Sequence, residues 1–246
     1  MGRERLDKVL SEAAGCSRKE AAAYIRGGKV SVGEKILRDP SAKIDPGSDE
    51  LRLNGQVKRL LRNVVYMLNK PEGILTATED PSEKTVLDLI RPEDRPKSLF
   101  PAGRLDKDVT GLVLLTDDGI YCHRIISPQS RIYKIYEALV EGLPDESDLL
   151  AVRNGLVLLP DGETCLPGIL TVTEAGKQSL CRLMICEGKY HQVKRMMAAL
   201  GKPVLRLKRI AVGGLFLDPA LSPGEYRALS TEECELVFRG EDPFAK

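Results

Sequence analysis

The sequence lacks any apolar segment long enough to cross a membrane. A membrane span needs roughly 18 to 20 consecutive apolar residues, and the densest apolar run among the 246 residues, 111–115, is far shorter. The first residues, 1–7, are charged and no apolar segment follows them, so they do not resemble a secretory signal. We therefore expect a cytoplasmic protein without a membrane contact.

The sequence also lacks the motifs of several catalytic classes. It contains no P-loop, GxGxxG, GxSxG or HExxH pattern, which argues against nucleotide hydrolysis, hydride transfer, acyl transfer and metal-dependent hydrolysis. Its six cysteines are scattered without a CxxC, and only two histidines could join them as metal ligands. We expect reduced thiols, no metal and no cofactor, so that any reaction runs on side chains alone.

The composition that is present is that of a folded globular protein. Hydrophobic residues make up 42% of the chain and charged residues 30%. The length suits one large domain or two unequal ones. With 37 Lys or Arg against 36 Asp or Glu, the formal net charge is +1. This total predicts neither a nucleic acid nor an acidic partner, so the distribution of the charge must decide.

The first 60 residues predict two short helices followed by a small strand unit. Apolar residues recur at helical spacing over 6–13. Ser17 and Glu20 have the spacing of a capping box for a second helix, which the glycines at 27–28 end. Alternating residues over 29–33 then predict a strand with a turn.

The same 60 residues hold 13 Lys or Arg and 9 Asp or Glu, an excess of four positive charges. This excess suits a surface that faces phosphates, although a helical hairpin solvated by water has the same composition. The segments 5–10 (RLDKVL), 17–21 (SRKEA) and 28–33 (GKVSVG) resemble the small RNA-binding module named after ribosomal protein S4. The resemblance implies that the second helix lies against RNA backbone. The RNA contacts expected in this module are Arg5, Arg18, Lys19, Arg26 and Lys29.

Short β-type runs dominate the remainder of the chain. The predicted class is α+β: a small N-terminal α/β RNA-binding module (1–60), then a largely antiparallel mixed sheet flanked by helices in a catalytic domain (61–246). Strands are expected at 64–68, 112–115, 132–140, 155–159, 169–172, 180–186 and 204–212. Helices are expected at 86–90, 120–126, 147–153 and 191–200, the last with an apolar stripe of Val193, Met196, Met197 and Leu200.

Positive charge is concentrated a second time, in the segment 182–209. It holds eight basic residues and one acid, Glu187, while compensating acids lie at 141–148 and 218–242. Segregated charge of this kind lets a nearly neutral protein grip a polyanion, although a run of charges is often only a solvated face. Because a basic segment also stands at the N-terminus, we interpret 182–209 as an RNA contact.

The outstanding reactive candidate is the segment 103–106 (GRLD), which precedes a predicted strand. A carboxylate beside an arginine can act as a nucleophile or base where a second cation keeps it ionised in a dry pocket, and Lys194 could be that cation. Asp106 could instead only pair with Arg104 or begin a turn. Asp108 is the competing carboxylate, but it lies outside the GRLD register.

Longer motifs decide between these alternatives. The segments 103–112 (GRLDKDVTGL) and 114–119 (LLTDDG) resemble the active-site motif of pseudouridine synthases. Three further segments match motifs of that family in order and spacing: 70–73 (KPEG), 134–136 (KIY) and 187–196 (EGKYHQVKRM). With the N-terminal module, the resemblance spans nearly the whole chain. It implies an isomerase that converts uridine in RNA to pseudouridine without a cofactor.

The resemblance also implies roles for single residues. Asp106 matches the catalytic aspartate and Lys194 the cation that pairs with it; Arg104 matches the arginine that helps to fill the space of the extruded nucleotide. Tyr136 matches the aromatic residue that stacks on the flipped base, an interaction worth roughly 1 to 3 kcal/mol. Without the motifs, Tyr136 could equally be a core residue and Lys194 a solvated one. Further RNA contacts are expected at Lys70, Lys134, Lys189, His191, Gln192 and Arg195.

The S4-type module together with the GRLD and HQVKRM forms resembles the branch of the family that modifies ribosomal RNA. With 213–215 (GGL) and 221–227 (LSPGEYR), this implies 16S rRNA as the partner, free or in a small-subunit assembly intermediate, and uridine 516 as the target. A 23S rRNA substrate is the alternative. A non-catalytic RNA-binding assembly protein is the rival from another class, against which the intact catalytic set argues. We expect a monomer.

Overall fold

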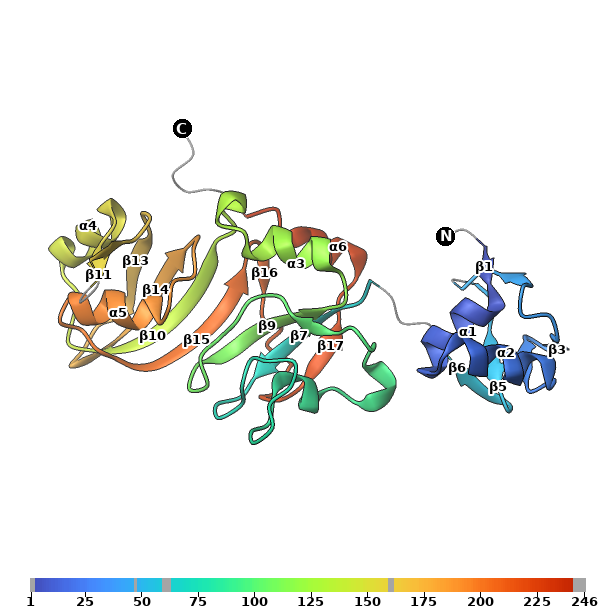
Figure 1. Ribbon diagram of the computed structural model, residues 1–246. Helices are drawn as coiled ribbons and strands as arrows, with labels where there is room; N and C mark the ends of the chain where they lie inside the picture. The colour runs from blue at the N-terminus through green and yellow to red at the C-terminus, as the bar shows by residue number, and fades with distance from the viewer. Residues whose placement is uncertain (1–2, 47, 59–62, 159–161, 241–246) are drawn as a thin grey trace. The chain divides into compact units, whose positions relative to one another are not determined.

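The computed structural model describes residues 3–46, 48–58, 63–158 and 162–240. The chain divides into two compact units, Met1–Arg62 and Asn63–Lys246 (Figure 1). The domain boundary predicted between residues 60 and 61 lies outside the described residues.

The first unit begins with β1 (Glu4–Arg5) and the helices α1 (Leu6–Ala14) and α2 (Arg18–Arg26). Helix α1 ends at Gly15, whose φ of 64° is a left-handed conformation that glycine adopts most readily. Helix α2 begins with the predicted capping box: the Ser17 hydroxyl accepts from the backbone N–H of Glu20, and the Glu20 carboxylate accepts from that of Ser17. Both predicted helices are confirmed.

The strands of this unit share one apolar core with its helices. A four-stranded antiparallel sheet runs in the order β3 (Lys35–Ile36), β2 (Val30–Val32), β5 (Leu51–Leu53) and β6 (Gln56–Lys58), and β4 (Lys43–Ile44) pairs with β1. The buried core residues are Leu6, Val9, Leu10, Ala21, Ile25, Val30, Ile44 and Leu51. Helix and strand residues are thus buried together, and the strand predicted at 29–33 is present as β2.

The second unit is built on one large mixed sheet. Along it run β13 (Ile169–Glu174), β14 (Gln178–Ile185), β10 (Lys134–Glu141), β15 (Val204–Val212), β9 (Thr110–Thr116), β7 (Val65–Lys70) and β17 (Tyr226–Ala228). β8 (Phe100–Pro101) pairs with β9, and β16 (Leu215–Phe216) pairs with β15. β15 and β9 are parallel, whereas the other neighbours along this order are antiparallel. The predicted α+β class is confirmed.

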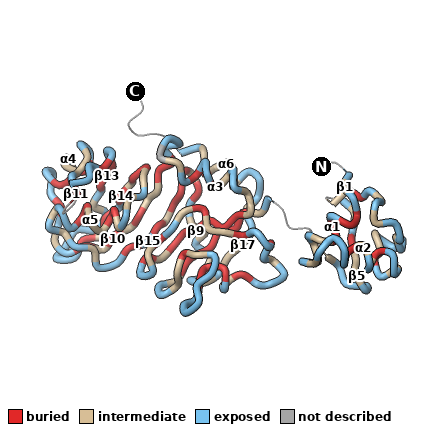
Figure 2. The backbone as a smooth tube through the Cα atoms, in the orientation of Figure 1, coloured by how far each residue is buried: buried red, intermediate tan, exposed pale blue. Residues whose placement is uncertain are grey.

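Helices cover the two faces of this sheet. α4 (Glu146–Asn154) contacts β13 and α5 (Gln192–Ala199) contacts β15, while α3 (Gly119–Ile126) contacts β9 and α6 (Thr231–Leu236) contacts β16. Successive residues of β9 enter different apolar clusters: Leu112 and Leu114 join Ile125 of α3, whereas Val113 joins Met196 of α5. Figure 2 shows the buried positions gathered along these strands. The sheet therefore separates two cores.

Several elements differ from the prediction. The helix predicted at 86–90 is present as a short 3₁₀ helix, Val86–Leu89. The predicted strand 155–159 is the short β11 (Val157–Leu158), which pairs with β12 (Glu163–Thr164); its last residue lies outside the described residues. The strands β8, β12, β16 and β17 and the helix α6 were not predicted. A signal for α6 was present, since Ser230 and Glu233 form a capping box.

The parallel strands β9 and β15 approach closely at Gly111. Its φ is 100°, and a Cβ there would lie 2.2 Å from the carbonyl oxygen of Arg209. Only glycine fits this contact, which brings β15 beside the residues that precede β9. Across the described residues, no helix is long and apolar enough to span a bilayer.

Candidate active site

The segment 104–109 forms the approach to β9 and is fixed by hydrogen bonds. The hydroxyl of Thr76 donates to the carbonyl oxygen of Leu105 (2.8 Å) and accepts from the N–H of the same residue (3.2 Å). The carbonyl oxygen of Asp106 accepts from the N–H of Val109 (3.1 Å), which closes a turn. The Asp106 side chain is therefore carried on a backbone held at both ends.

Lys70, the last residue of β7, has no exposed surface. Its ammonium donates to the carbonyl oxygens of Pro71 (3.0 Å), Lys107 (3.1 Å) and Val109 (2.8 Å), and burial lowers its pKa to about 8. The RNA contact predicted for Lys70 is therefore corrected: this ammonium ties β7 to the segment 104–109. Every residue of β7 is buried, so the strand has no solvent face for it.

Asp106 lies against two side chains from the start of α5. The Nζ atom of Lys194 is 3.0 Å from its Oδ2, and the Nε2 atom of His191 is 3.5 Å from its Oδ1. The contact predicted between Asp106 and Lys194 is thus present, although 88 residues separate them in sequence. The carboxylate is about one-third exposed and faces a cation at short range.

Lys194 is shared with the competing carboxylate, Asp108, whose oxygens lie 2.7 and 2.9 Å from Nζ. Burial acts to lower the pKa of Lys194, but its hydrogen bonds to Asp108 and Asp106 outweigh that effect and raise it above its ordinary value. The hydrogen bond with Lys194 in turn lowers the pKa of Asp108. The ammonium therefore stays charged at neutral pH and bridges both acids.

A pocket of about 470 Å³ opens beside Asp106. Tyr136 of β10 lines it although only 8% of the residue is exposed, and Arg104 lines it as an exposed side chain. A pocket with an aromatic ring in its wall and a carboxylate and an ammonium at its edge can bind a flat polar ligand such as a nucleobase.

The loop before α5 is organised by Gln192, which is 4% exposed. Its Oε1 accepts from the N–H of Lys189 (2.9 Å), and its Nε2 donates to Glu187 (2.7 Å), which also accepts from the N–H of Leu166 (2.7 Å). The RNA contact predicted for Gln192 is corrected, because its amide is used inside the loop. The prediction also missed Glu187; the signal for it was its position as the lone acid of 182–209.

Three other residues predicted from this motif lie around the same loop. Lys189 and His191 line the pocket. Lys189 and Arg195 both pair with Glu163, at 3.6 and 3.2 Å. His191 precedes α5 with a φ of 47°, a left-handed conformation that few residues with side chains adopt. The loop therefore combines partly neutralised cations with a constrained backbone.

The basic segment 182–209 does not form one surface. Tyr136 lines the pocket, so its neighbour on the strand, Glu137, points to the opposite face of the sheet. Glu137 is in register with Arg182 of β14 and Lys208 of β15, both of which are exposed. The sheet therefore divides the charges of 182–209 between two faces, and the RNA contact predicted for this segment stays a prediction for the residues around the pocket.

Lys134, from a predicted motif, and Arg209 of β15 both direct their cationic groups toward backbone carbonyl oxygens. The ammonium of Lys134 lies 3.4 Å from the carbonyl oxygen of Ile125 in α3, and burial together with the nearby charge of Arg209 lowers its pKa to about 8. Lys134 is partly exposed, and the RNA contact predicted for it stays a prediction. Arg209, which the prediction did not single out, is 4% exposed and donates to the carbonyl oxygens of Leu112 (2.8 Å) and Arg104 (3.5 Å).

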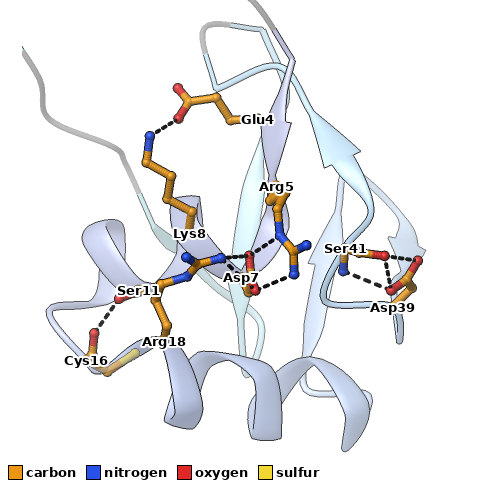
Figure 3. A network of polar contacts seen from close by, with 9 residues as sticks. All are labelled: Glu4, Arg5, Asp7, Lys8, Ser11, Cys16, Arg18, Asp39 and Ser41. Atoms are coloured by element: carbon orange, nitrogen blue, oxygen red, sulfur yellow. Dashed lines mark hydrogen bonds and ion pairs between the residues drawn. The ribbon is translucent and has the colours of Figure 1, made fainter.

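The five cations predicted to contact RNA in the first unit are all exposed: Arg5, Arg18, Lys19, Arg26 and Lys29. Arg5 and Arg18 share the carboxylate of Asp7, at 2.9 and 3.0 Å (Figure 3). The hydrogen bond from Arg5, supported by Arg18, lowers the pKa of Asp7 to about 2. Asp7 therefore orients two guanidinium groups whose side chains remain 51% and 58% exposed.

Known proteins resemble both units. Residues 64–199 match the family model described as RNA pseudouridylate synthase, and residues 4–50 match the S4 domain. The ribosomal small subunit pseudouridine synthase A of Escherichia coli (strain K12) is 40% identical over 235 residues, 95% of this chain and 99% of that protein. An uncharacterized RNA pseudouridine synthase of Bacillus subtilis (strain 168) is 40% identical over 234 residues, 95% of this chain and 98% of that protein.

A crystal structure of a pseudouridylate synthase covers 95% of this chain and 99% of its own, with a TM-score of 0.66 and 36% identity. The likeness in sequence and in fold thus extends over almost the entire chain. It follows that the chain belongs to the RNA pseudouridine synthases, a family of isomerases, and that an S4 RNA-binding domain precedes its catalytic part.

Proposed function

We propose that this enzyme converts one uridine of ribosomal RNA, uridine 516 of 16S rRNA, to pseudouridine, with Asp106 as the catalytic carboxylate. The observation that carries the proposal is the ion pair of Asp106 with Lys194, 3.0 Å long, at a pocket lined by Tyr136 and Arg104. The name of the Escherichia coli relative supports a small-subunit substrate. The Bacillus subtilis relative is equally similar and carries no such name, which keeps 23S rRNA as the alternative.

The chemistry requires that the uridine leave its stack. The reaction breaks the bond between C1′ and N1, turns the uracil and joins C1′ to C5, while the hydrogen of C5 is lost and N1 gains a proton. No atom is gained or lost overall. An aspartate paired with an ammonium can act on the sugar or ring as nucleophile or base once the nucleotide is flipped. The ion pair of Asp106 with Lys194 is such an arrangement.

Flipping costs base stacking, which the pocket must replace. Stacking of a base on an aromatic ring contributes roughly 1 to 3 kcal/mol, and Tyr136 offers such a ring in the pocket wall. Arg104 is exposed beside it and has the length and charge to enter the space that the nucleotide leaves. We assign these two residues to holding the flipped state and Asp106 to the reaction itself.

The substrate is tested by mapping pseudouridine in rRNA by mass spectrometry, in cells with and without this protein and after adding the purified enzyme to unmodified RNA. We expect one uridine of 16S rRNA to be unmodified in cells that lack the protein. The same uridine should become pseudouridine when the purified enzyme is added to unmodified RNA. Free 16S rRNA and a partly assembled small-subunit particle are compared as substrates. Conversion of a 23S uridine alone would contradict the small-subunit assignment, and conversion of neither RNA would contradict the ribosomal one.

The catalytic residue is tested with Asp106→Asn, for which Asp108→Asn is the matched control. The amide keeps the shape of the carboxylate but supplies no anion, so we expect conversion to fall by more than about a thousandfold with RNA affinity nearly unchanged. In the control, Lys194 can still pair with Asp106, and conversion should persist. Turnover by the first variant together with its loss in the second would transfer the role to Asp108.

A further inference from the structure

Tyr190, in the loop before α5, is an aromatic residue that is largely exposed to solvent. It is 76% exposed, whereas Tyr24, Tyr66, Tyr121, Tyr133, Tyr136 and Tyr226, the other tyrosines of the chain, are buried or partly buried. A single exposed apolar side chain is ordinary in itself. Tyr190, however, lines the same pocket as Asp106. An aromatic ring left in solvent beside a reactive group is available to a ligand.

The ring of Tyr190 is mounted on a constrained support. It stacks on the imidazole of His191 with centroids 3.8 Å apart and an angle of 21° between the planes. The carbonyl oxygen of Tyr190 accepts from Arg195 of α5 (3.4 Å), and the N–H of the preceding Lys189 donates to Gln192 (2.9 Å). Because the backbone is held on both sides, the ring loses little conformational entropy when a ligand binds it.

The stacked rings of Tyr190 and His191 lie next to Asp106 and line its pocket. His191 lies between the two groups: one ring face meets Tyr190, and its Nε2 is 3.5 Å from Asp106. One face of Tyr190 is therefore covered by His191, and the high exposure of the residue leaves the other available. Lys189 beside it supplies positive charge for a phosphate, partly balanced by Glu163 and Glu187.

We propose that Tyr190 is the stacking platform for a nucleobase adjacent to the uridine that is flipped. The inference rests on the proposed function and extends it to a second nucleotide. When one base leaves a stack, its neighbours lose a stacking partner, and an aromatic face at the pocket replaces it. Tyr136 thus receives the target base and Tyr190 a flanking one. Every base has a π-face, so the platform accepts any of them.

The competing explanation is that Tyr190 only packs on His191 and so keeps the imidazole near Asp106. Leucine distinguishes the two roles, since it keeps apolar contact with His191 but offers no flat ring. Phenylalanine keeps the ring and removes the hydroxyl. Phe216 of β16 is the matched control, being an aromatic residue 57% exposed and outside the lining of the pocket.

The test uses a fragment of the RNA that the mapping experiment identifies, with 2-aminopurine placed next to the target uridine on either side in turn. Its fluorescence is quenched by stacking. With the full-length enzyme, we expect quenching at one of the two positions, retained in Tyr190→Phe and abolished in Tyr190→Leu. The dissociation constant of Tyr190→Leu should rise about 5- to 150-fold, with a smaller effect on the single-turnover rate at saturating RNA. Phe216→Leu should match the wild type in both measurements.

The outcomes separate this inference from the function beneath it. If the wild-type enzyme converts no ribosomal RNA, the proposed function fails. If it converts RNA but Tyr190→Leu binds as tightly as Phe216→Leu, or if neither flanking position is quenched, the platform fails alone. A Tyr190→Leu variant that binds normally but reacts slowly would assign Tyr190 to support of His191 and overturn the platform.

Discussion

At the scale of single residues, Lys194 bridges the carboxylates of Asp106 and Asp108. The variant Lys194→Met keeps an unbranched stem but leaves Asp106 without the ammonium 3.0 Å away. We expect the single-turnover rate near neutral pH to fall about ten- to a hundredfold, because no cation then balances the charge of the carboxylate that acts on the substrate.

Single-turnover rates at saturating RNA, measured near neutral pH, give this comparison. Arg195→Met is the control, because Arg195 is the next residue of α5 and pairs with Glu163 rather than Asp106. Its rate should stay close to that of the wild type. Equal rates for wild type and Lys194→Met would mean that the ion pair does not contribute to the reaction.

At the scale of elements, the close contact between β9 and β15 requires a residue without a side chain at Gly111. In Gly111→Ala, the new methyl group would lie 2.2 Å from the carbonyl oxygen of Arg209 and would also be attached to a backbone with a φ of 100°. Overpacking and left-handed strain each cost about 1 to 3 kcal/mol, so we expect the second unit to lose roughly 2 to 6 kcal/mol of unfolding free energy. Gly119→Ala, at the start of α3, has free space for its methyl group.

The two variants are compared by urea unfolding of the full chain, which gives the free energy of unfolding. Hydrogen exchange of the amides in the second unit reports the stability of that unit separately. Gly119→Ala should be neutral or slightly stabilising, because alanine favours helix and restricts the unfolded chain. Equal stability of Gly111→Ala and wild type would show that β15 can move away without cost.

Regular elements with local signals could be predicted from the sequence, and inward-facing polar groups could not. The capping box of Ser17 and the apolar stripe of α5 are encoded within a few residues. The burial of Lys70 and Gln192 depends on Val109 and Glu187, contacts that no periodicity reveals. The juxtaposition of Asp106 and Lys194 came from the family resemblance rather than from spacing, since 88 residues separate them.

At the scale of the whole molecule, affinity and chemistry should be separable. Lys19 and Arg26 are exposed on α2, and neutralising them leaves the pair of arginines on Asp7 intact. Removing one cation that binds a phosphate reduces the slope of log affinity against log salt by roughly 0.7 to 0.9. The double variant Lys19→Gln/Arg26→Gln should therefore have a slope shallower by about 1.4 to 1.8 units and still convert RNA at saturation.

The matched control neutralises Lys35 and Lys43, which are also exposed but belong to β3 and β4. Its salt dependence should stay close to that of the wild type, as a titration of RNA binding over several salt concentrations would detect. An equal decrease of slope in both double variants would mean that the unit attracts RNA through its total charge and not through α2. A collapse of saturated conversion would mean that the unit contributes to the reaction.

The position of β15 in the sheet also has a consequence during synthesis. Tyr136 and Asp106 are both made early, but the strand between β10 and β9 is Val204–Val212, and Lys194 precedes it by only ten residues. A nascent chain that ends before β15 contains the S4 unit, Asp106, Tyr136 and Lys194, but it lacks the strand that lies between β9 and β10 and the pocket residue Leu207. The S4 unit is therefore made before the catalytic pocket can form. A chain truncated before β15 should lack pseudouridine synthase activity.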